Sequence, residues 1–525
     1  MDEFDYIIVG AGAAGCTLAA RLTEDPSVHV LLLEAGPAPG RKLELPLPAA
    51  FPKLIGSAFD WAFETPPEPG LGGRRVVFPR GRTLGGSTAT NAMIYTRGHR
   101  ADFEAWADEA GEGWGPDALA PRFARAEATL SLQALRDPNP LSHAFVRAAH
   151  DAGLPHHGDA AGERDGVGLA RVNQRNGRRF SAADAYLRPA RRRPNLTIRT
   201  DALTLGLRWA GERRVDGVAY RTDGQRHGAR ARREVVLCAG AIGSPHLLLR
   251  SGVGPAEHLR AHGVEVRHAL PGVGQGLVDH PLCPIVYTCR APVSLKSAES
   301  PLQLLRYLIG RRGMLSSNIA EVVCFLRTHH ALDAPDLELM LAPVTWNGQG
   351  VEPPTQHGFS IGVAALAPAS RGQVALASPD ADRAPVIRPG YLTDPADLRV
   401  LIHGLRLARR LAAHPGLQAF GDVTEQAPTA GATTDDEMSA ALRQALQTFY
   451  HPAGTCRMGS DPLAVVDPTL RVQGVDGLRV ADASVMPTLV RAHPQAAVHA
   501  IAEHAVDLLR DGAPSARLAK PVASP

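Results

Sequence analysis

Continuous apolar runs and helically spaced apolar positions alternate at the start of this 525-residue chain. The run 5–9 is short, apolar and β-rich, which is typical of a buried parallel strand. Small and apolar residues over 16–22 predict a helix directly after it. A second apolar run, 28–33, predicts another strand. Together these elements indicate a strand–helix–strand unit at the N-terminus.

The turn between the first strand and the helix is rich in glycine. It reads Gly10-Ala11-Gly12-Ala13-Ala14-Gly15, and Glu34 ends the second strand. Glycines at this spacing let the backbone approach a pyrophosphate at the helix N-terminus, whose N–H groups and dipole favour an anion. An acid at the end of the second strand suits the hydroxyl pair of a ribose. The unit therefore predicts a dinucleotide site.

Further along, the pattern predicts a mixed α/β fold. Short strand-like runs occur at 196–199, 217–220 and 234–238, and spaced runs over 320–390 favour an antiparallel sheet. Helices are expected at 102–109, 142–152, 246–251, 395–413, 435–448 and 494–509. Strand-to-turn signals recur at both ends and in the middle, so distant segments converge on one long ligand. FAD fits that arrangement better than NAD.

Composition narrows the class of protein. The net charge is +3, with 21% charged and 44% hydrophobic residues, which argues for a globular protein and against nucleic acid as the main partner. No apolar stretch has the length of a membrane span, and the acidic N-terminus is unlike a secretory signal. The six cysteines are scattered, without a CxxC pair. We expect a cytoplasmic protein with reduced cysteines and no metal site.

Four segments resemble the glucose–methanol–choline (GMC) family of FAD-dependent oxidoreductases. They are 10–15 with Glu34, 81–98 (GRTLGGSTATNAMIYTRG), 240–254 (GAIGSPHLLLRSGVG), and 450–459 (YHPAGTCRMG) with 478–487. The resemblance implies a Rossmann-like, discontinuous FAD-binding domain from residues 1–155, 190–290 and 450–512. A substrate-binding domain with an antiparallel sheet and helices would comprise 156–189 and 291–449. The short tail 513–525 is rich in proline and alanine, and we expect it to be disordered.

The resemblance also implies which residues hold FAD. The expected set is Gly10, Gly12, Ala13, Ala14, Gly15, Glu34, Ala35, Arg82, Gly85, Gly86, Ser87, Asn91, Ala92, Met93, Leu203, Ala239, Asp482, Ala483, His493, Pro494 and Gln495. In some relatives a histidine just before the asparagine of the second segment is the covalent attachment point of the flavin. Thr90 stands there in this chain. We therefore expect FAD to be bound non-covalently.

The expected chemistry resides in two histidines, His451 and His493, which match the family's catalytic positions. A neutral imidazole with a pKa near working pH suits removal of a hydroxyl proton while hydride leaves for flavin. We expect His451 to act as base or proton mediator and His493 to orient the hydroxyl of a primary alcohol. Glu321 alternates with apolar residues, so its face is either part of the substrate cavity or an exposed strand face.

Several alternatives stay open. A hydroxynitrile-lyase-like or photodecarboxylase-like flavoprotein on the same fold would keep the FAD site, whereas an NAD-dependent dehydrogenase would not. The sequence does not distinguish oxygen from a quinone-type electron acceptor, and it leaves the oligomeric state open. The tripeptide Asp279-His280-Pro281 matches a family loop and is interpreted as structural.

Overall fold

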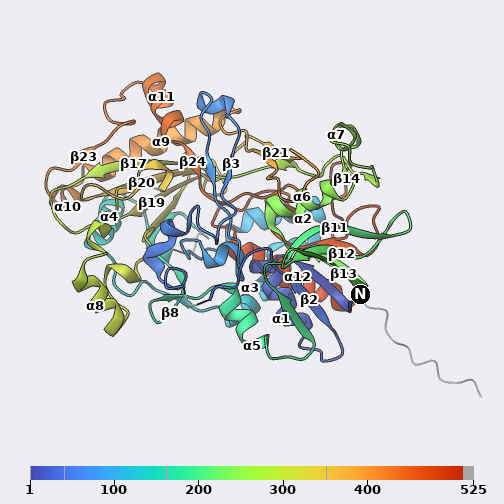
Figure 1. Ribbon diagram of the computed structural model, residues 1–525. Helices are drawn as coiled ribbons and strands as arrows, with labels where there is room; N and C mark the ends of the chain where they lie inside the picture. Colours follow the sequence, from blue (N-terminus) through green and yellow to red (C-terminus); the bar gives the residue numbers. More distant parts are fainter. Residues whose placement is uncertain (1, 41, 161–163, 351, 512–525) are drawn as a thin grey trace, which may run out of the picture.

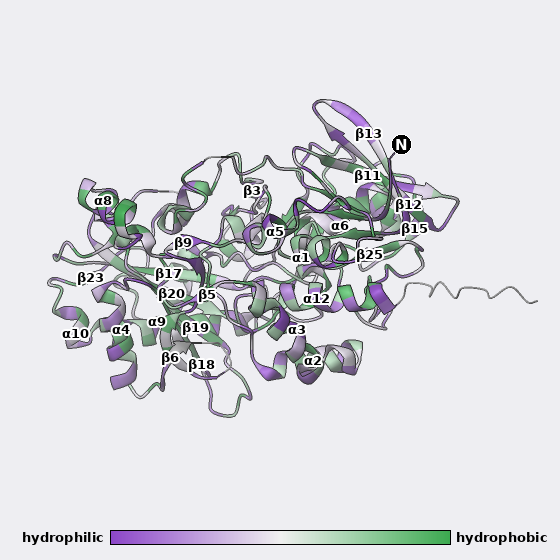
Figure 2. Ribbon diagram, turned by 90° about the horizontal axis from the view of Figure 1, so that it is seen from below, coloured by the Kyte–Doolittle hydropathy of each residue, from purple (hydrophilic) through white to green (hydrophobic). Residues whose placement is uncertain are grey.

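The computed structural model describes residues 2–40, 42–160, 164–350 and 352–511. Two large sheets lie at opposite sides of the molecule in both ribbon views (Figures 1 and 2). Each has its own large hydrophobic core cluster. The tail predicted at 513–525 lies outside the described residues. Among the described residues, no helix combines the length and the apolar character needed to cross a membrane.

The first sheet contains the N-terminal strand–helix–strand unit. Strands β10, β2, β1, β13 and β25 run parallel, and β13, β12 and β11 continue the sheet as an antiparallel extension. Its members are β10 (Leu196–Arg199), β2 (Val30–Leu33), β1 (Asp2–Val9), β13 (Gln225–Leu237), β12 (Arg214–Thr222) and β11 (Leu203–Ala210), with β25 (Leu478–Val480) beside β13. The apolar end of β1 is buried because β1 is a central strand, between β2 and β13, and helices cover the sheet there.

Three helices pack beside this sheet: α12 (Gln495–Asp511) lies between α1 (Ala13–Leu22) and α3 (Pro116–Thr129) and contacts both. Helix α6 (Gly240–Arg250) follows β13 directly. The prediction placed this helix at 246–251, too late, because glycines and alanines dominate its first turn. The sequence also missed α3 and most of β13. In β13 exposed arginines alternate with the small buried residues Ala229 and Ala231, so the hydropathy pattern conceals the strand.

The second sheet is antiparallel except for the pairing of β6 with β7. It comprises β23 (Thr424–Glu425), β17 (Pro281–Thr288), β20 (Gly358–Ala365), β19 (Leu337–Ala342), β18 (Val322–Leu326), β7 (Gly166–Ala170) and β6 (His156–Ala160), with β24 (Gln447–Thr448) beside β17. Helices α4 (Pro140–Asp151), α9 (Pro395–Ala412) and α11 (Asp435–Ala445) pack against it. The antiparallel sheet and these helices agree with the predicted fold class.

The other strands and helices lie outside the two large sheets and the helices that pack on them. The small strands are β3 (Phe63–Glu64) with β4 (Val77–Phe78), β5 (Leu132–Gln133) with β8 (Val172–Arg175) and β9 (Arg178–Arg179), β14 (Val253–Gly254) with β15 (His268–Ala269), and β16 (Gln275–Leu277) with β21 (Gly372–Ala375) and β22 (Val386–Arg388). The remaining helices are α2 (Arg100–Ala110), α5 (Arg188–Ala190), α7 (Ala256–Ala261), α8 (Pro301–Gly310) and α10 (Pro415–Gln418).

Two elements pack differently from the proposed domain boundaries. Strand β17 and helix α4 pack with the second sheet, whereas the proposed boundaries place residues up to 155 and from 190 to 290 in the FAD-binding part. The chain passes into β17 directly after Asp279-His280. The loop that precedes this strand therefore lies where the two parts meet.

Candidate active site

A cavity of about 610 Å³ extends from the glycine turn to the two predicted catalytic histidines. Segments from both ends and from the middle of the chain line it, as a single long ligand requires. Most of the residues expected to bind FAD or to act in catalysis line this cavity: Gly10, Gly12, Ala13, Ala14, Glu34, Ala35, Arg82, Gly86, Ser87, Asn91, Ala92, Met93, Leu203, Ala239, Asp482, Ala483, His451, His493, Pro494 and Gln495. Gly15, Gly85 and Glu321 lie outside it.

The glycine turn explains why Gly15 is needed although it does not face the cavity. A Cβ at Gly15 would lie 1.9 Å from the carbonyl oxygen of Gly10, so a side chain there would push α1 away from β1. Gly12 is different: the nearest atom to its Cβ would be the Cys238 oxygen at 4.0 Å. Since Gly12 lines the cavity, this open space is where a ligand phosphate would approach the N-terminus of α1.

Glu34 is buried at the end of β2, beside the glycine turn. Its carboxylate accepts hydrogen bonds from the backbone N–H of Ala11 at 3.0 Å and of Gly36 at 2.9 Å. Burial raises the pKa of Glu34 to about 7, while these two donors act in the opposite direction. The carboxylate therefore both fixes the turn and faces the cavity, where its remaining lone pairs can accept from ribose hydroxyls.

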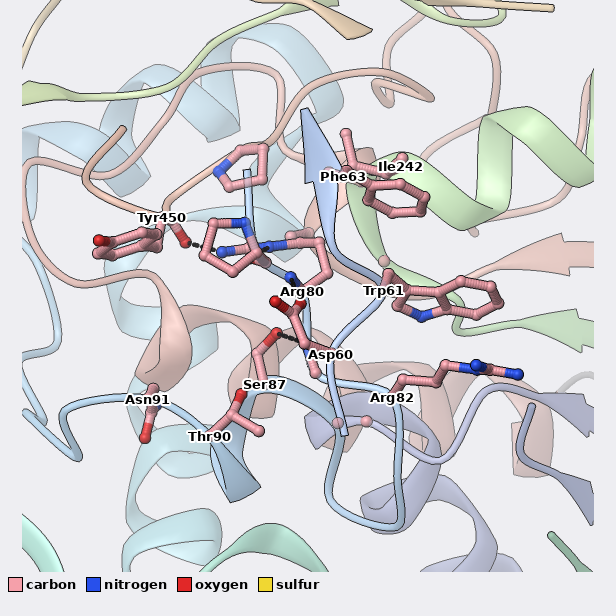
Figure 3. Close-up of a pocket in the computed structure, with 18 of the residues that line it drawn as sticks. Asp60, Trp61, Phe63, Arg80, Arg82, Ser87, Thr90, Asn91, Ile242 and Tyr450 are labelled. Atoms are coloured by element: carbon pink, nitrogen blue, oxygen red, sulfur yellow. Dashed lines mark hydrogen bonds between the residues drawn. The ribbon is translucent and has the colours of Figure 1, made fainter. Parts of the chain in front are cut away.

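Arg82 provides the clearest buried hydrogen-bond donor without a protein acceptor in this part of the cavity. Its Nε is buried and has no hydrogen-bond partner among the described residues, and its guanidinium lies 5.0 Å from the centre of the Trp61 ring. Figure 3 shows Arg82 and Trp61 side by side. A buried donor without a partner is costly, so an anionic or carbonyl-bearing ligand fits this position. The residues present thus fit a dinucleotide.

Asp482 joins α6 to the C-terminal segment. One of its oxygens accepts from the Gly240 N–H at 2.8 Å and the Ser244 hydroxyl at 2.6 Å, and the other accepts from the N–H and hydroxyl of Ser484. Because Asp482 and the first turn of α6 both line the cavity, this carboxylate holds a second helix N-terminus at the ligand site.

Asn91 is positioned by neighbours on both sides of its amide. Its Nδ2 donates to Gln495 Oε1 at 2.7 Å, and its Oδ1 accepts from Arg179 Nη1 and the Met93 N–H, each at 3.0 Å. Arg179 was absent from the predicted set, since nothing in its local sequence indicates that it is buried. Thr90 also lines the cavity (Figure 3).

The two predicted catalytic histidines lie together at the other end of the cavity. The ring centres of His451 and His493 are 4.8 Å apart and the rings are nearly perpendicular, at 76°. Phe449 packs against both, with ring-centre distances of 4.5 and 5.1 Å. The backbone N–H of His493 donates a hydrogen bond to Thr96 Oγ1 at 3.0 Å. Two residues 42 positions apart in sequence therefore form one compact polar site with an aromatic wall.

The loop that carries His451 is fixed by buried hydrogen bonds. The Asp279 carboxylate accepts hydrogen bonds from the backbone N–H of His451 at 2.8 Å, from the Thr448 hydroxyl at 2.6 Å and from the Tyr391 hydroxyl. Tyr450 has a left-handed backbone, with φ of 67°, and its carbonyl accepts from Arg80 Nη2 at 2.7 Å. Figure 3 shows Arg80 reaching toward Tyr450. These contacts present the His451 side chain to the cavity.

His280 connects the imidazole of His451 to the second sheet. Its Nε2 lies 3.1 Å from the Leu366 carbonyl oxygen, and its Nδ1 lies 3.0 Å from Nδ1 of His451. A carbonyl only accepts, so His280 carries its proton on Nε2, and burial lowers the pKa of His280 to about 3. Its Nδ1 is then an acceptor, which places the His451 proton on Nδ1 and leaves Nε2 of His451 unprotonated.

His451 is held neutral as well as in one tautomer. Burial lowers the pKa of His451 well below its usual range, and neighbouring His493, His280 and Arg80 act in the same direction. The expected pKa near working pH is therefore wrong for this site. His451 Nε2 has a free lone pair over the whole neutral range.

A buried carboxylate supports the second histidine. His493 Nε2 lies 3.0 Å from Oε1 of Glu338, which is fully buried in β19. The other oxygen, Oε2, has no partner among the described residues. Sequence reasoning missed Glu338, because an acid between Leu337 and Leu339 has the pattern of an exposed strand position.

Glu321 occupies neither of its two expected positions. It is 1% exposed and lies outside the cavity. Its oxygens accept from the Asn139 N–H at 2.7 Å and from the hydroxyls of Ser142 at 2.7 Å and Ser317 at 2.5 Å. Burial raises the pKa of Glu321, and these donors oppose the increase. Glu321 thus connects β18 to the start of α4 and is not a substrate ligand.

Comparisons with known proteins identify the family. The GMC oxidoreductase N-terminal model matches residues 4–282, and the C-terminal model matches 368–502. The chain is 42% identical to an uncharacterized GMC-type oxidoreductase of Mycobacterium tuberculosis (97% of this chain, 99% of the relative). It is 38% identical to an alcohol dehydrogenase [acceptor] of Pseudomonas putida (96% and 95%).

A solved structure shows the same fold. The crystal structure of pyridoxine 4-oxidase from Mesorbium loti matches with a TM-score of 0.88 and 34% identity, over 97% of this chain and 99% of that one. This match confirms the predicted fold class, and the family confirms FAD as the cofactor. The cavity, with its glycine turn, buried acid and unpartnered arginine, is the part of the fold that fits this cofactor. The chain belongs to the GMC oxidoreductase family of FAD-dependent flavoproteins.

Proposed function

We propose that this protein oxidises a primary, uncharged alcohol to the carbonyl compound, with His451 as the catalytic base. The observation that carries the proposal is the pairing of His451 and His493 at one end of the FAD cavity, with His451 neutral and its Nδ1 bonded to His280. Bound FAD supplies the hydride acceptor for such a reaction. The residues of the chain handle the hydroxyl group.

His451 Nε2 is suited to accept the hydroxyl proton. It is the ring nitrogen that remains once Nδ1 has bonded to His280, and the lowered pKa keeps it unprotonated. The same low pKa means that the imidazolium formed in the reaction releases its proton readily to solvent, which returns His451 to its starting state. The short contact with His280 preserves the tautomer through this cycle.

His493 is suited to orient the substrate oxygen. Its Nε2 lies 3.0 Å from Oε1 of Glu338, and this buried contact fixes the orientation of the ring. Nδ1 is then the ring nitrogen of His493 that is left to meet the substrate oxygen. His451 and His493 thus have different roles, set by different partners: a neutral histidine for one and an acid for the other.

The wall beyond the histidines favours an uncharged substrate. It includes Leu282, Met340, Ala342 and Trp346, together with Phe449, and none of these side chains carries a charge that could pair with a charged substrate. Phe449 packs against both imidazoles, which leaves more room beside them for a carbinol carbon with one carbon substituent than for one with two. These features support a primary alcohol with an apolar chain or ring.

Two finer points belong to the same proposal. FAD is bound non-covalently, because Thr90 stands where a linking histidine would stand, and acid or heat denaturation should release the flavin from the polypeptide. The electron acceptor is either oxygen or a quinone-type compound. Hydrogen peroxide formed in air would identify an oxidase, whereas reduction of an added quinone or dye without peroxide would identify a dehydrogenase.

A substrate screen tests the proposal. Purified protein is mixed with primary and secondary alcohols under argon, and bleaching of the flavin absorbance is followed by rapid mixing. His451→Ala should retain FAD but lower the reduction rate by about 10²–10⁴-fold, the usual size of a lost general base. A fully loaded His451→Ala protein that is reduced at the wild-type rate would refute the assignment, and an absence of bleaching with every alcohol would refute the reaction.

A further inference from the structure

Helix α8 (Pro301–Gly310) exposes an unusual number of large apolar side chains. Leu302, Leu304, Leu305, Leu308 and Ile309 are between 48% and 79% exposed. They make up five of the eight large hydrophobic side chains that are exposed in the described part of the chain. In both ribbon views α8 lies at an edge of the molecule, and Figure 2 shows hydrophobic positions along it.

The exposed face is not a consequence of a loosely attached helix. On its other side, Tyr307 and Gln303 are buried, and the Tyr307 hydroxyl donates to the Gly177 carbonyl at 3.1 Å. Gln303 Oε1 accepts from the Met314 N–H at 3.1 Å. The helix is therefore anchored by one face while the leucine-rich face is directed outward. We call the five exposed leucine and isoleucine side chains of α8 the α8 patch.

Basic side chains flank the α8 patch. Arg306 and Arg312 are exposed, Arg311 follows the helix at once, and Lys296 lies just before it. The single acid in residues 295–313, Glu299, forms an ion pair with Lys53. An apolar helix face bordered by positive charge is the pattern of a helix that lies in the plane of a membrane surface containing anionic lipids.

We propose that the α8 patch docks this protein on the surface of an anionic phospholipid bilayer. The leucine and isoleucine side chains would enter the boundary between headgroups and acyl chains, and the arginines would contact lipid phosphates. The helix is far too short to span a bilayer, so the attachment is peripheral. Each flanking arginine is expected to strengthen binding by about fivefold at low salt.

A second copy of the chain is the less suitable occupant of the same surface. Two α8 patches facing each other would bring Arg306, Arg311 and Arg312 of both copies together, which is unfavourable. The patch also exposes only on the order of 500 Å² of surface, judged from the exposed fractions of its five residues and ordinary leucine and isoleucine areas. A stable dimer buries about 800 Å² on each partner. Charge and area therefore both favour a lipid surface.

Docking through α8 would place the substrate end of the cavity near the bilayer. The buried face of the helix packs, through Tyr307, in the same hydrophobic cluster as Phe51, Ile319 and Ala342. Those three residues line the cavity. If the proposed function holds, an alcohol with an apolar chain, which partitions into membranes, would be concentrated close to this wall. The docking itself does not depend on that function.

Vesicle binding by the full-length, FAD-loaded protein tests the proposal. Cosedimentation is measured with phosphatidylcholine vesicles that contain phosphatidylglycerol and with pure phosphatidylcholine vesicles. Binding should be stronger to the anionic vesicles and should weaken as salt is added. Leu305→Glu and Leu308→Glu should each lower the partition coefficient at least tenfold, since each places a charge where an apolar side chain would enter the bilayer. Arg312→Gln should lower it about fivefold.

Leu463→Glu is the matched control, because Leu463 is 52% exposed on a different surface. It should bind vesicles like the wild type. Equal loss of binding in Leu463→Glu and Leu308→Glu, or no binding of the wild type to anionic vesicles, would overturn the proposal. Light scattering on the same proteins measures the oligomeric state and so tests the alternative occupant, a second copy of the chain. A wild-type dimer that becomes monomeric in Leu308→Glu, together with no vesicle binding, would show that α8 contacts a second copy instead. Flavin content and flavin reduction by soluble alcohols should be unchanged in all variants.

Discussion

His280→Phe is the most informative single change, because it removes both ring nitrogens at a position that does not line the cavity. In the wild type, His280 connects the Leu366 carbonyl to Nδ1 of His451 through contacts of 3.1 and 3.0 Å. Phenylalanine fills the same space but accepts no hydrogen bond. The Nδ1–H of His451 then loses its acceptor, or the proton moves to Nε2, where it blocks the proposed base.

The size of the effect follows from the lost hydrogen bond. A buried N–H without a partner costs about 1–3 kcal/mol, and about 1.4 kcal/mol corresponds to a tenfold change in rate. We therefore expect His280→Phe to lower kcat/KM roughly five- to hundredfold. Movement of the proton to Nε2 would relieve the unpaired N–H, but it would leave the reactive tautomer as the minor form, so kcat/KM falls by either route.

The assay is rapid-mixing flavin reduction by the best alcohol from the screen, with FAD content measured on each preparation. His280→Asn is the matched variant, since its side-chain oxygen can accept from Nδ1 of His451 in place of the imidazole nitrogen. It should recover part of the lost rate. A fully loaded His280→Phe protein that is reduced at the wild-type rate would refute the role of His280. Equal rates for His280→Asn and His280→Phe would show that the acceptor is not what matters.

Four further outcomes are expected. Glu338→Gln keeps a hydrogen-bond acceptor for His493 but removes the carboxylate. Because hydrogen bonds to charged groups are stronger than those to neutral groups, kcat should fall about tenfold with little change in KM in steady-state kinetics. An unchanged kcat would contradict this. Because burial lowers the pKa of His451, kcat/KM should stay level as pH falls through 6.5 and decline only at lower pH, so a pH profile centred near 6.5 would contradict the assigned environment. Burial lowers the pKa of His499 to about 4, so below pH ~6.5 this histidine binds a proton in the unfolded chain but not in the folded one. Its contribution should lower the free energy of unfolding by about 2 kcal/mol between pH 7 and pH 5. Urea unfolding of His499→Gln at these two pH values should lack that part of the decrease. Gly12→Val fills the open space at the start of α1, so absorbance should show FAD lost from a folded protein, and full FAD content would place the pyrophosphate elsewhere.

Local patterns in the sequence predicted the strand, turn and helix that line the N-terminal part of the cavity. The apolar run of β1, the glycine turn and Glu34 lie within a few dozen residues, and their roles follow from strand, turn and helix geometry that the nearby residues determine. His451 and His493 were found through family motifs. Nothing local indicates that their ring centres lie 4.8 Å apart, since that distance depends on how the loop after β24 meets the segment before α12.

Residues whose roles depend on contacts between distant segments were missed or misplaced. His280 contacts a partner 171 positions away, so the sequence shows the motif but not the partner. Arg179 is buried against the Asn91 amide in a short strand with no apolar pattern. Helix α3 has exposed charges on much of its surface and is held mainly by packing on α12.

Glu338 and Glu321 show the limit of pattern reasoning most directly. Both are acids among apolar residues of the second sheet, and both are buried. Alternation along a strand states which residues share a face, but not what covers that face. For Glu321 the cover is the start of α4, whose N–H and hydroxyl groups satisfy the carboxylate, so the charge is structural. For Glu338 the cover is His493, from the segment before α12, so its carboxylate contacts a residue that lines the cavity. The same sequence pattern thus yields an acid bound to a helix start just before β18 and an acid bound to a cavity histidine in β19, and the difference arises from which distant segment packs on each acid.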